Sequence, residues 1–218
     1  MTTTALARER LLDDCPLPRL LCDDAAGSAA AWRSLLGTVE GVEIEVGCGR
    51  GVFLAAEALR RPRLGFLGIE SSPKWARLAA SALARQGIAN AAVVQAEALS
   101  FLRTRVSEAS VEALHVYFPD PWPRTRHEKR RIWRPDFVGE VLRVLAPGGK
   151  IITATDIRGY FIAIQRMLTA HACLQQRELP EAWPVTAYAR KFLDRGRPVF
   201  STLFVKHAGP PDQESHGA

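Results

Sequence analysis

The chain contains the stretch Ile44-Glu45-Val46-Gly47-Cys48-Gly49-Arg50-Gly51, an apolar run that breaks into three alternate glycines. Glycine adopts positive φ angles without strain and leaves room for a ligand beside the backbone, so this spacing predicts a strand, a tight turn and a helix. A purely structural turn would use the same residues. The context favours a ligand, because the next apolar run, Leu64–Ile69, ends in Glu70, whose carboxylate can accept hydrogen bonds from ribose hydroxyls.

From Val42 onward, short apolar runs alternate with longer amphipathic segments, which is typical of strands and helices that alternate around a mostly parallel sheet. We therefore expect an α/β fold with a seven-stranded sheet, helices on both faces and an antiparallel edge strand. The expected strands are residues 42–46, 64–69, 92–95, 113–118, 150–155, 174–179 and 199–206. The expected helices are residues 29–36, 52–60, 73–86, 98–105, 135–144, 158–171 and 186–193.

Two local signals set boundaries in this pattern. Ser72 is expected to cap the helix whose first turn holds Pro73, and Pro147–Gly149 is expected to form a tight turn before the fifth strand. We expect an N-terminal extension over residues 1–40, one domain over residues 41–208, and a disordered polar tail over residues 209–218.

Composition limits the class of protein. The chain has 218 residues and a net charge of +6, which favours a polyanionic partner. Its four cysteines lack the spacing of a zinc site, so no metal is expected. The first 20 residues lack the apolar core of a signal peptide, and no apolar run approaches membrane-spanning length, so we expect a cytoplasmic protein.

The residue before the glycines indicates the kind of cofactor. A dinucleotide fingerprint has the spacing GxGxxG and seats a diphosphate on a helix N-terminus, whereas this chain has GxGxG preceded by Glu45. An acid there repels a diphosphate but suits a ligand that carries an amino group and a sulfonium, so the pattern favours S-adenosylmethionine over NAD. Gln95, which ends the third strand, is expected beside the adenine, while Glu97 reads as a solvated residue of a helix first turn.

A second stretch, Tyr117–Pro123, places Asp120 between two prolines. Proline fixes its own φ and restricts the residue before it, so Asp120 is expected in a stiff loop that aims its carboxylate. The alternative is a loop acid that caps a helix. Trp122 of the same loop could stack on a base or cover the core.

A cationic run follows this loop directly and contains one acid, Glu128. Such a run is often a solvated helix face, but its position favours a track for the phosphates of RNA. His127 is expected to belong to this surface rather than to act as a base. The cations of the run are Arg124, Arg126, Lys129, Arg130, Arg131 and Arg134.

Together these residues resemble the bacterial tRNA (guanine-N(7)-)-methyltransferases, which have the Rossmann-like fold of class I S-adenosylmethionine-dependent methyltransferases. The resemblance covers the chain from Val42 to Lys206. It rests on IEVGCGRG, the GIE that ends at Glu70, FPDPWPRTRHEKRR, the LAPGG turn, the ATD that ends at Asp156, and TAYARKF from Thr186.

The resemblance implies a site and a target. Asp120 would be catalytic and would line the cofactor site together with Glu45, Gly47, Gly49, Glu70 and Gln95. The substrate residues would be Arg124, Asp156, Thr186 and Tyr188, and the target would be the guanosine at nucleotide 46 of the tRNA variable loop. The chain departs from the family in Gln95, where Asp or Asn is usual, in Arg124, where Lys is common, and in Ala189, where Glu is frequent.

The chemistry of guanine N7 fits a carboxylate that positions rather than deprotonates. N7 carries a lone pair and no proton, so its attack on a sulfonium methyl needs alignment, not a general base. We expect Asp120 to hold the N–H edge of guanine, with Asp156 as a second anchor or as a helix cap. The competing functions are amino-group methylation of DNA or protein, and RNA binding without catalysis. The expected partner is tRNA, and the expected assembly is a monomer or a homodimer.

Overall fold

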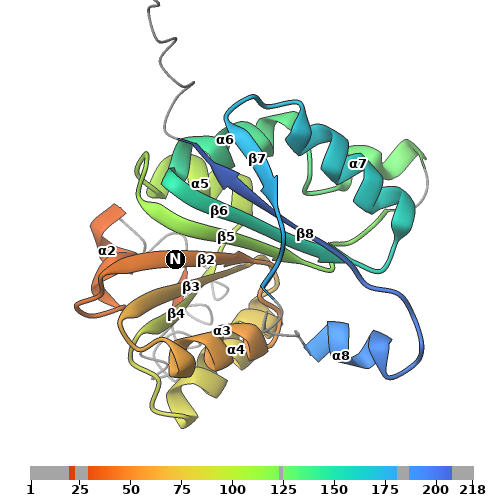
Figure 1. Cartoon of the computed structure of the whole chain (residues 1–218). Helices are drawn as coiled ribbons and strands as arrows, with labels where there is room; N and C mark the ends of the chain where they lie inside the picture. Colours follow the sequence, from red (N-terminus) through yellow and green to blue (C-terminus); the bar gives the residue numbers. More distant parts are fainter. Residues whose placement is uncertain (1–19, 23–28, 123–124, 181–186, 208–218) are drawn as a thin grey trace, which may run out of the picture.

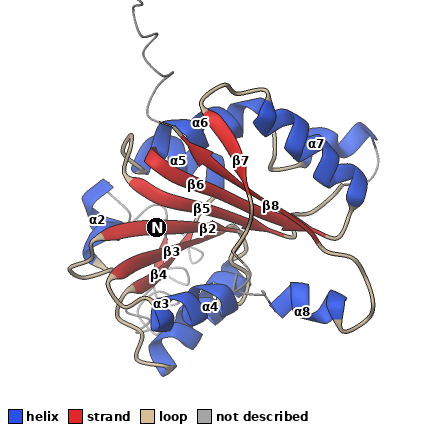
Figure 2. Cartoon of the chain, in the orientation of Figure 1, coloured by secondary structure: helices blue, strands red, loops and turns tan. Residues whose placement is uncertain are grey.

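A computed structural model of the chain describes residues 20–22, 29–122, 125–180 and 187–207 (Figure 1). Its centre is an eight-stranded sheet with the strand order β1-β4-β3-β2-β5-β6-β8-β7 (Figure 2). Neighbouring strands run parallel from β1 to β6. β8 runs antiparallel to both β6 and β7, so the sheet reverses direction one strand inside its edge.

The bounds of the elements follow the sequence pattern closely. The strands are β1 (Leu20–Cys22), β2 (Gly41–Val46), β3 (Leu64–Glu70), β4 (Ala91–Gln95), β5 (Val111–Tyr117), β6 (Leu145–Thr155), β7 (Leu174–Arg177) and β8 (Phe200–Lys206). The helices are α2 (Ala29–Ser34), α3 (Val52–Arg60), α4 (Pro73–Arg85), α5 (Ala98–Arg105), the 3-10 helix η2 (Thr125–Arg130), α6 (Pro135–Val144), α7 (Arg158–Thr169) and α8 (Ala187–Leu193).

The α/β fold with a mostly parallel sheet is confirmed, but the expected number of seven strands was wrong. The additional strand is β1, where Leu21 pairs in parallel with Val94 of β4. The extension also supplies Trp32, which is fully buried and donates a 2.9 Å hydrogen bond from Nε1 to the Arg105 carbonyl. Residues within the first 40 therefore complete the sheet and its core. The expected tail over residues 209–218 lies outside the described residues.

Two local expectations also need correction. Ser72 precedes the first turn of α4, but its side chain makes no capping hydrogen bond. Its backbone N–H donates instead to Glu70, at 2.9 Å. The strand expected to begin at Lys150 begins at Leu145, because Leu145 already pairs with Val111, and the Pro–Gly–Gly turn forms a register shift inside the strand.

Helices cover both faces of the sheet (Figure 1). Helices α3 and α4 pack on one face, and α2, α5, α6 and α7 pack on the other. Helix α4 buries mostly alanine side chains and therefore packs close to the turn before α3. A Cβ on Gly51 would lie only 3.0 Å from the Cβ of Ala79. This close packing holds the turn before α3 against α4. No helix in the described part of the chain is long and apolar enough to cross a membrane.

Candidate active site

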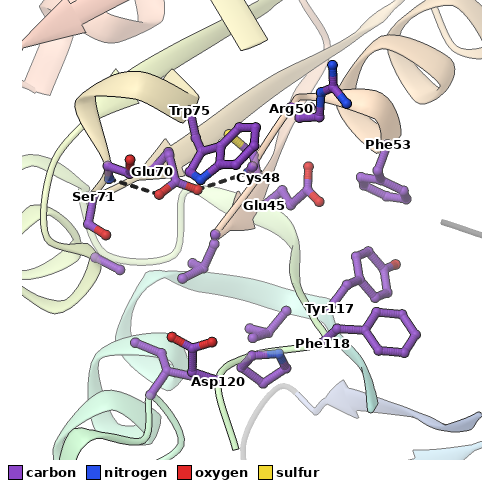
Figure 3. Close-up of a pocket in the computed structure, with 18 of the residues that line it drawn as sticks. Glu45, Cys48, Arg50, Phe53, Glu70, Ser71, Trp75, Tyr117, Phe118 and Asp120 are labelled. Carbon is purple, nitrogen blue, oxygen red and sulfur yellow. Dashed lines mark hydrogen bonds between the residues drawn. The ribbon is translucent and has the colours of Figure 1, made fainter. Parts of the chain in front are cut away.

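A cavity of about 590 Å³ opens at the carboxyl ends of β2, β3 and β5 (Figure 3). Ligands of open α/β sheets bind at this edge, where the loops after neighbouring strands meet. The walls come from the turn after β2, the end of β3 with the first turn of α4, and the loop after β5. They include five of the six residues expected at the cofactor: Glu45, Gly47, Gly49, Glu70 and Asp120.

The glycine loop, Gly47–Gly51, needs its glycines for their backbone angles. Gly47 and Gly49 have φ angles of 74° and 54°, and a Cβ on either would meet nothing within 4 Å. Their backbone therefore borders open space. Glu70 holds this loop, since its Oε2 accepts the Gly49 N–H and its Oε1 accepts the Ser72 N–H, both at 2.9 Å (Figure 3). A carboxylate has further lone pairs that remain available to a ligand.

Glu45 is a buried acid that lacks a full set of partners. Its side chain is 5% exposed, and its Oε2 has no hydrogen-bond partner among the described residues. Burial, and to a smaller extent the nearby Glu70 carboxylate, raise the pKa of Glu45 to about 8. An unpaired buried carboxyl group is unfavourable unless a partner arrives. A cationic group of a ligand in the cavity would be such a partner, so the site fits a cofactor that carries one.

The end of β4 differs from expectation. Gln95 pairs in register with Glu70 of β3 and Cys22 of β1, and it is not among the residues that line the cavity. Glu97 does line it. Glu97 is exposed as expected, but it is the N-cap residue of α5, and its carboxylate accepts the N–H groups of Leu99 and Ser100 at 3.1 and 2.8 Å.

The Asp120 loop, Phe118–Trp122, is strained on both sides of Asp120. Phe118 and Trp122 have φ angles of 50° and 38°, a region that costs a residue with a side chain about 1–2 kcal/mol. Asp120 itself is exposed and lines the cavity. Backbone strain of this kind persists only where surrounding contacts enforce it, and it concentrates at functional sites.

Two sets of hydrogen bonds enforce the conformation of the Asp120 loop. At its start, the Phe118 N–H donates to the Ala154 carbonyl at 2.7 Å. At its end, Arg131 donates from Nε to the Pro121 carbonyl at 2.8 Å and from Nη2 to the Trp122 carbonyl at 3.3 Å. Arg131 also pairs with Glu128 through Nη1, and its side chain is only 20% exposed. This arginine, expected from the sequence to bind RNA, is occupied inside the protein.

The ring of Tyr160 lies beneath this arginine. The Arg131 guanidinium carbon lies 5.1 Å from the Tyr160 ring centroid. The pKa of Tyr160 is raised to about 12, mainly by burial and in part by the Asp120 carboxylate, while a backbone hydrogen bond at Trp133 and the charge of Arg131 oppose the rise.

Three other cations of the run lie on the surface of η2. Arg126, Lys129 and Arg130 are exposed. Arg130 lies 5.0 Å above the Trp122 ring, and both residues line the mouth of the cavity. His127 packs edge-to-face on Trp122 at 5.7 Å and accepts a hydrogen bond from Arg126. Trp122 is thus a half-buried wall residue rather than part of the core.

Arg134, the last cation of the run, uses its guanidinium for hydrogen bonds within the protein. It donates to both carboxylate oxygens of Asp136 at 3.1 and 3.2 Å and to the Lys129 carbonyl at 2.9 Å. The described part of the run, from Arg126 onward, therefore divides into a surface group on η2 and two arginines, Arg131 and Arg134, that hold the backbone around it.

Of the expected substrate residues, Asp156 is the one whose side chain the structure describes. Asp156 pairs with Arg197 at 2.5 Å and does not line the cavity. It does not cap α7 either, since the cap residue of that helix is Ile157 and has no side-chain capping bond. Arg197 lies 4.5 Å from the Phe192 ring of α8, and Phe192 packs on Phe118 with ring centroids 5.3 Å apart.

Contacts thus connect the end of β6, α8 and the Asp120 loop, which are far apart in the sequence. Tyr188 falls within α8. Arg124 and Thr186 lie outside the described residues.

Several wall residues were missed by sequence reasoning, among them Arg50, Phe53, Trp75 and Tyr117 (Figure 3). Each lies at the carboxyl end of a strand, in the loop after it, or in the first turn of the helix that follows. Phe53 and Trp75 occupy the first turns of α3 and α4. An aromatic residue at the end of a strand, or in the first turn of the helix that follows, is a signal that could have identified the three aromatic residues among them.

Comparison with known proteins shows which family the chain is related to. A family model described as "Putative methyltransferase" matches residues 40–202. A tRNA (guanine-N(7)-)-methyltransferase of Geobacter metallireducens is 30% identical over 198 residues, which cover 88% of this chain and 94% of the relative. A protein of the same name from Ralstonia nicotianae is 31% identical over 211 residues, which cover 94% of this chain and 83% of the relative.

Solved structures share the fold at low sequence identity. The 16S rRNA methyltransferase KamB aligns with a TM-score of 0.60 at 16% identity, covering 83% of this chain and 94% of its own. A SAM-dependent methyltransferase from Aquifex aeolicus aligns with a TM-score of 0.55 at 15% identity, covering 92% of this chain and 97% of its own. The expected Rossmann-like class I methyltransferase fold is thereby confirmed.

Proposed function

The chain belongs to the tRNA (guanine-N(7)-)-methyltransferase family, and on this basis we propose that it transfers a methyl group from S-adenosylmethionine to N7 of a guanosine in tRNA. The observation that carries the proposal is one cavity shared by the buried, incompletely paired carboxyl group of Glu45 and the strained loop of Asp120. We propose nucleotide 46 of the variable loop as the target and the cytoplasm as the location.

The cofactor side of the cavity suits S-adenosylmethionine. Glu45 would pair with a cationic group of the cofactor, and the backbone of Gly47 and Gly49 would border it without side-chain obstruction. Glu70 would accept hydrogen bonds from the ribose hydroxyls while it also accepts the Gly49 N–H of the glycine loop. Gln95 remains our proposal for the adenine end, although it does not line the cavity.

The protein's task in this reaction is alignment. S-adenosylmethionine supplies an electrophilic methyl group, and guanine N7 supplies a lone pair without a proton to remove. The Asp120 carboxylate would accept hydrogen bonds from the N–H groups at the edge of guanine and stabilise the positive charge that develops on the purine. The prolines beside Asp120 and the enforced φ angles of Phe118 and Trp122 limit the motion of this carboxylate. Reduced motion matters because misplacement by about 1 Å can cost roughly 100-fold in rate.

The surface around the cavity mouth suits a polyanion. Arg126, Lys129 and Arg130 of η2 would contact phosphates, with His127 on the same surface. Trp122, with Arg130 over its ring, offers a face on which a base could stack. For Arg131 we propose a structural role in place of RNA binding, because its guanidinium already binds the Asp120 loop. The residues that remain proposed substrate contacts are Arg124, Asp156, Thr186 and Tyr188.

The test is transfer of labelled methyl groups to total tRNA, followed by digestion and nucleoside mapping. We expect N7-methylguanosine from the wild-type protein and a loss of about 100-fold or more in kcat for Asp120→Asn with an unchanged circular dichroism spectrum. Glu112→Gln removes an exposed carboxylate at the opposite end of β5 and should leave turnover intact. Methyladenine or methylated protein as the product would favour amino-group methylation, and absence of S-adenosylmethionine binding in calorimetry would favour a non-catalytic RNA-binding protein.

A further inference from the structure

A chain of buried polar side chains runs from the outer end of α3 to the cavity wall. Arg61 donates to the two carboxylate oxygens of Glu43 at 2.5 and 2.6 Å. Glu43 lies 3.0 Å from His115 Nε2, and His115 Nδ1 lies 3.0 Å from the Tyr117 hydroxyl. Glu43 is 6% exposed and His115 is 0% exposed, whereas Tyr117 lines the cavity.

The charge on Glu43 determines the direction of its hydrogen bonds. Burial alone would raise the pKa of Glu43, but hydrogen bonds from His115 and Arg61 outweigh it and lower the pKa to about 2. Because the carboxylate is ionised, it can only accept, so His115 Nε2 carries a proton and donates to it. The 3.0 Å contact between His115 Nδ1 and the Tyr117 hydroxyl is a hydrogen bond in either charge state of the ring, because the hydroxyl can donate to a bare Nδ1 or accept from a protonated one. The Tyr117 hydroxyl is thus tethered inside the protein.

Other ionisable groups surround this chain. Glu45 of β2 is the register partner of His115 on β5. Glu57 of α3 pairs with Arg61 at 2.7 Å and with Arg60 at 2.5 Å, so Arg61 bridges two buried acids. A network of buried charges seldom adds more stability than well-packed apolar residues would. Its presence directly behind the cavity therefore requires an explanation other than stability.

Packing fixes the Tyr117 ring from a second direction. Phe53 lies with its ring centroid 4.8 Å from that of His115 and 4.9 Å from that of Tyr117. Phe53 and Tyr117 stand beside Glu45 in the cavity (Figure 3). The residue after Tyr117 is Phe118, where the chain turns to a φ of 50° and the Asp120 loop begins. The tether on Tyr117 is thus one residue from the strain.

We infer that Glu43 and His115 are positioning residues for the proposed methyl transfer, because they tether Tyr117 and thereby fix both one wall of the cavity and the start of the Asp120 loop. The inference rests on the proposed function for its kinetic effect. Its structural part, the tether itself, stands on the hydrogen bonds and ring contacts alone.

The test compares Tyr117→Phe, which keeps the ring and removes the tether, with His115→Leu and His115→Gln. His207→Gln, an exposed histidine, is the control. We expect kcat for tRNA methylation to fall about 10- to 100-fold in Tyr117→Phe and His115→Leu, with little change in KM. His115→Gln should retain more activity than His115→Leu, since an amide can donate to Glu43 and accept from Tyr117. The control should match the wild type.

Two readouts do not depend on activity. Nitrogen-15 NMR of the wild type should show a proton on His115 Nε2, the nitrogen that donates to the Glu43 carboxylate. The Phe118 amide, which donates to the Ala154 carbonyl, should lose roughly 10-fold or more of its hydrogen-exchange protection in Tyr117→Phe, because local opening sets exchange. The control should leave this protection unchanged.

The outcomes separate the inference from the proposed function. If the wild type transfers no methyl group to tRNA, the proposed function fails. Hydrogen exchange of the Phe118 amide in Tyr117→Phe then still tests whether the tether exists. If the wild type is active and Tyr117→Phe keeps both wild-type kcat and wild-type protection at Phe118, the inference is overturned. Because Tyr117→Phe removes only a hydroxyl group, it tests the tether even if His115→Leu fails to fold.

Discussion

Replacing Arg131 by Ala should separate catalysis from RNA binding, with Arg130→Ala as the matched comparison. The two arginines are neighbours in the sequence and have the same side chain, but different surroundings. Arg131 donates to the carbonyls of Pro121 and Trp122, whereas Arg130 is exposed and lies over the Trp122 ring. The loss of Arg131 should therefore release the Asp120 loop, and the loss of Arg130 should weaken contact with the polyanion.

The expected size of the Arg131 effect follows from these bonds. A hydrogen bond to a charged group contributes about 1.5–3 kcal/mol when it is well shielded, and partial exposure of the guanidinium reduces this to about 1–1.5 kcal/mol for each of the two bonds. The left-handed conformations of Phe118 and Trp122 together cost about 2–4 kcal/mol. The two amounts are similar, so without Arg131 the loop should relax. A loss of about 2–3 kcal/mol corresponds to a fall of roughly 30- to 150-fold in kcat.

The assay is steady-state methylation of tRNA combined with tRNA binding across a salt titration. Arg131→Ala should lower kcat and leave the slope of log affinity against log salt close to that of the wild type. Arg130→Ala should weaken tRNA binding and reduce the magnitude of that slope by about one, as expected for one lost phosphate contact. If Arg131→Ala instead loses affinity and slope with a normal kcat, Arg131 is a phosphate ligand, and the reasoning from loop strain is refuted.

Three further predictions concern Glu45 and the glycine loop. With a pKa of about 8, Glu45 must lose its proton before it can pair with a cationic ligand. The Kd for S-adenosylmethionine should therefore fall about tenfold between pH 6 and pH 7. Calorimetry should show that this pH dependence is missing in Glu45→Gln. Stability should depend on pH in the opposite direction, because the folded state holds the Glu45 proton more tightly than the unfolded state does. The contribution of Glu45 to the free energy of unfolding should be greatest below its ordinary pKa of 4.5 and should decline up to about pH 8. Urea titrations of the wild type and of Glu45→Gln measure this difference. Gly51→Ala should destabilise the protein more than Gly47→Ala by the same measurement, because both carry a positive φ but only at Gly51 would the new Cβ lie 3.0 Å from the Ala79 Cβ; equal losses would count against the packing argument.

Local patterns were enough to predict most of the fold and the outline of the site. The glycine loop, Glu70 and the proline-flanked Asp120 each follow a strand, and parallel strands bring such positions to one edge of the sheet. β1 could not be predicted in this way, because three residues are too few to show an alternating pattern, and its place depends on a free edge of β4. The pairing of Asp156 with Arg197 was equally hidden, since the two residues are brought together by β6 and β8.

Residue type alone also could not divide the cationic run into ligands and structural residues. In η2 and the turn after it, the direction of each side chain decides whether an arginine meets water or the carbonyls of the preceding loop. Arg131 meets those carbonyls because the Asp120 loop folds back over it, and that fold depends in turn on the strain at Phe118 and Trp122. The loop is held at its end by Arg131 and at its start by the Phe118 amide, one residue beyond the tethered Tyr117. A carboxylate that must align a ligand rather than take its proton requires such support on both sides.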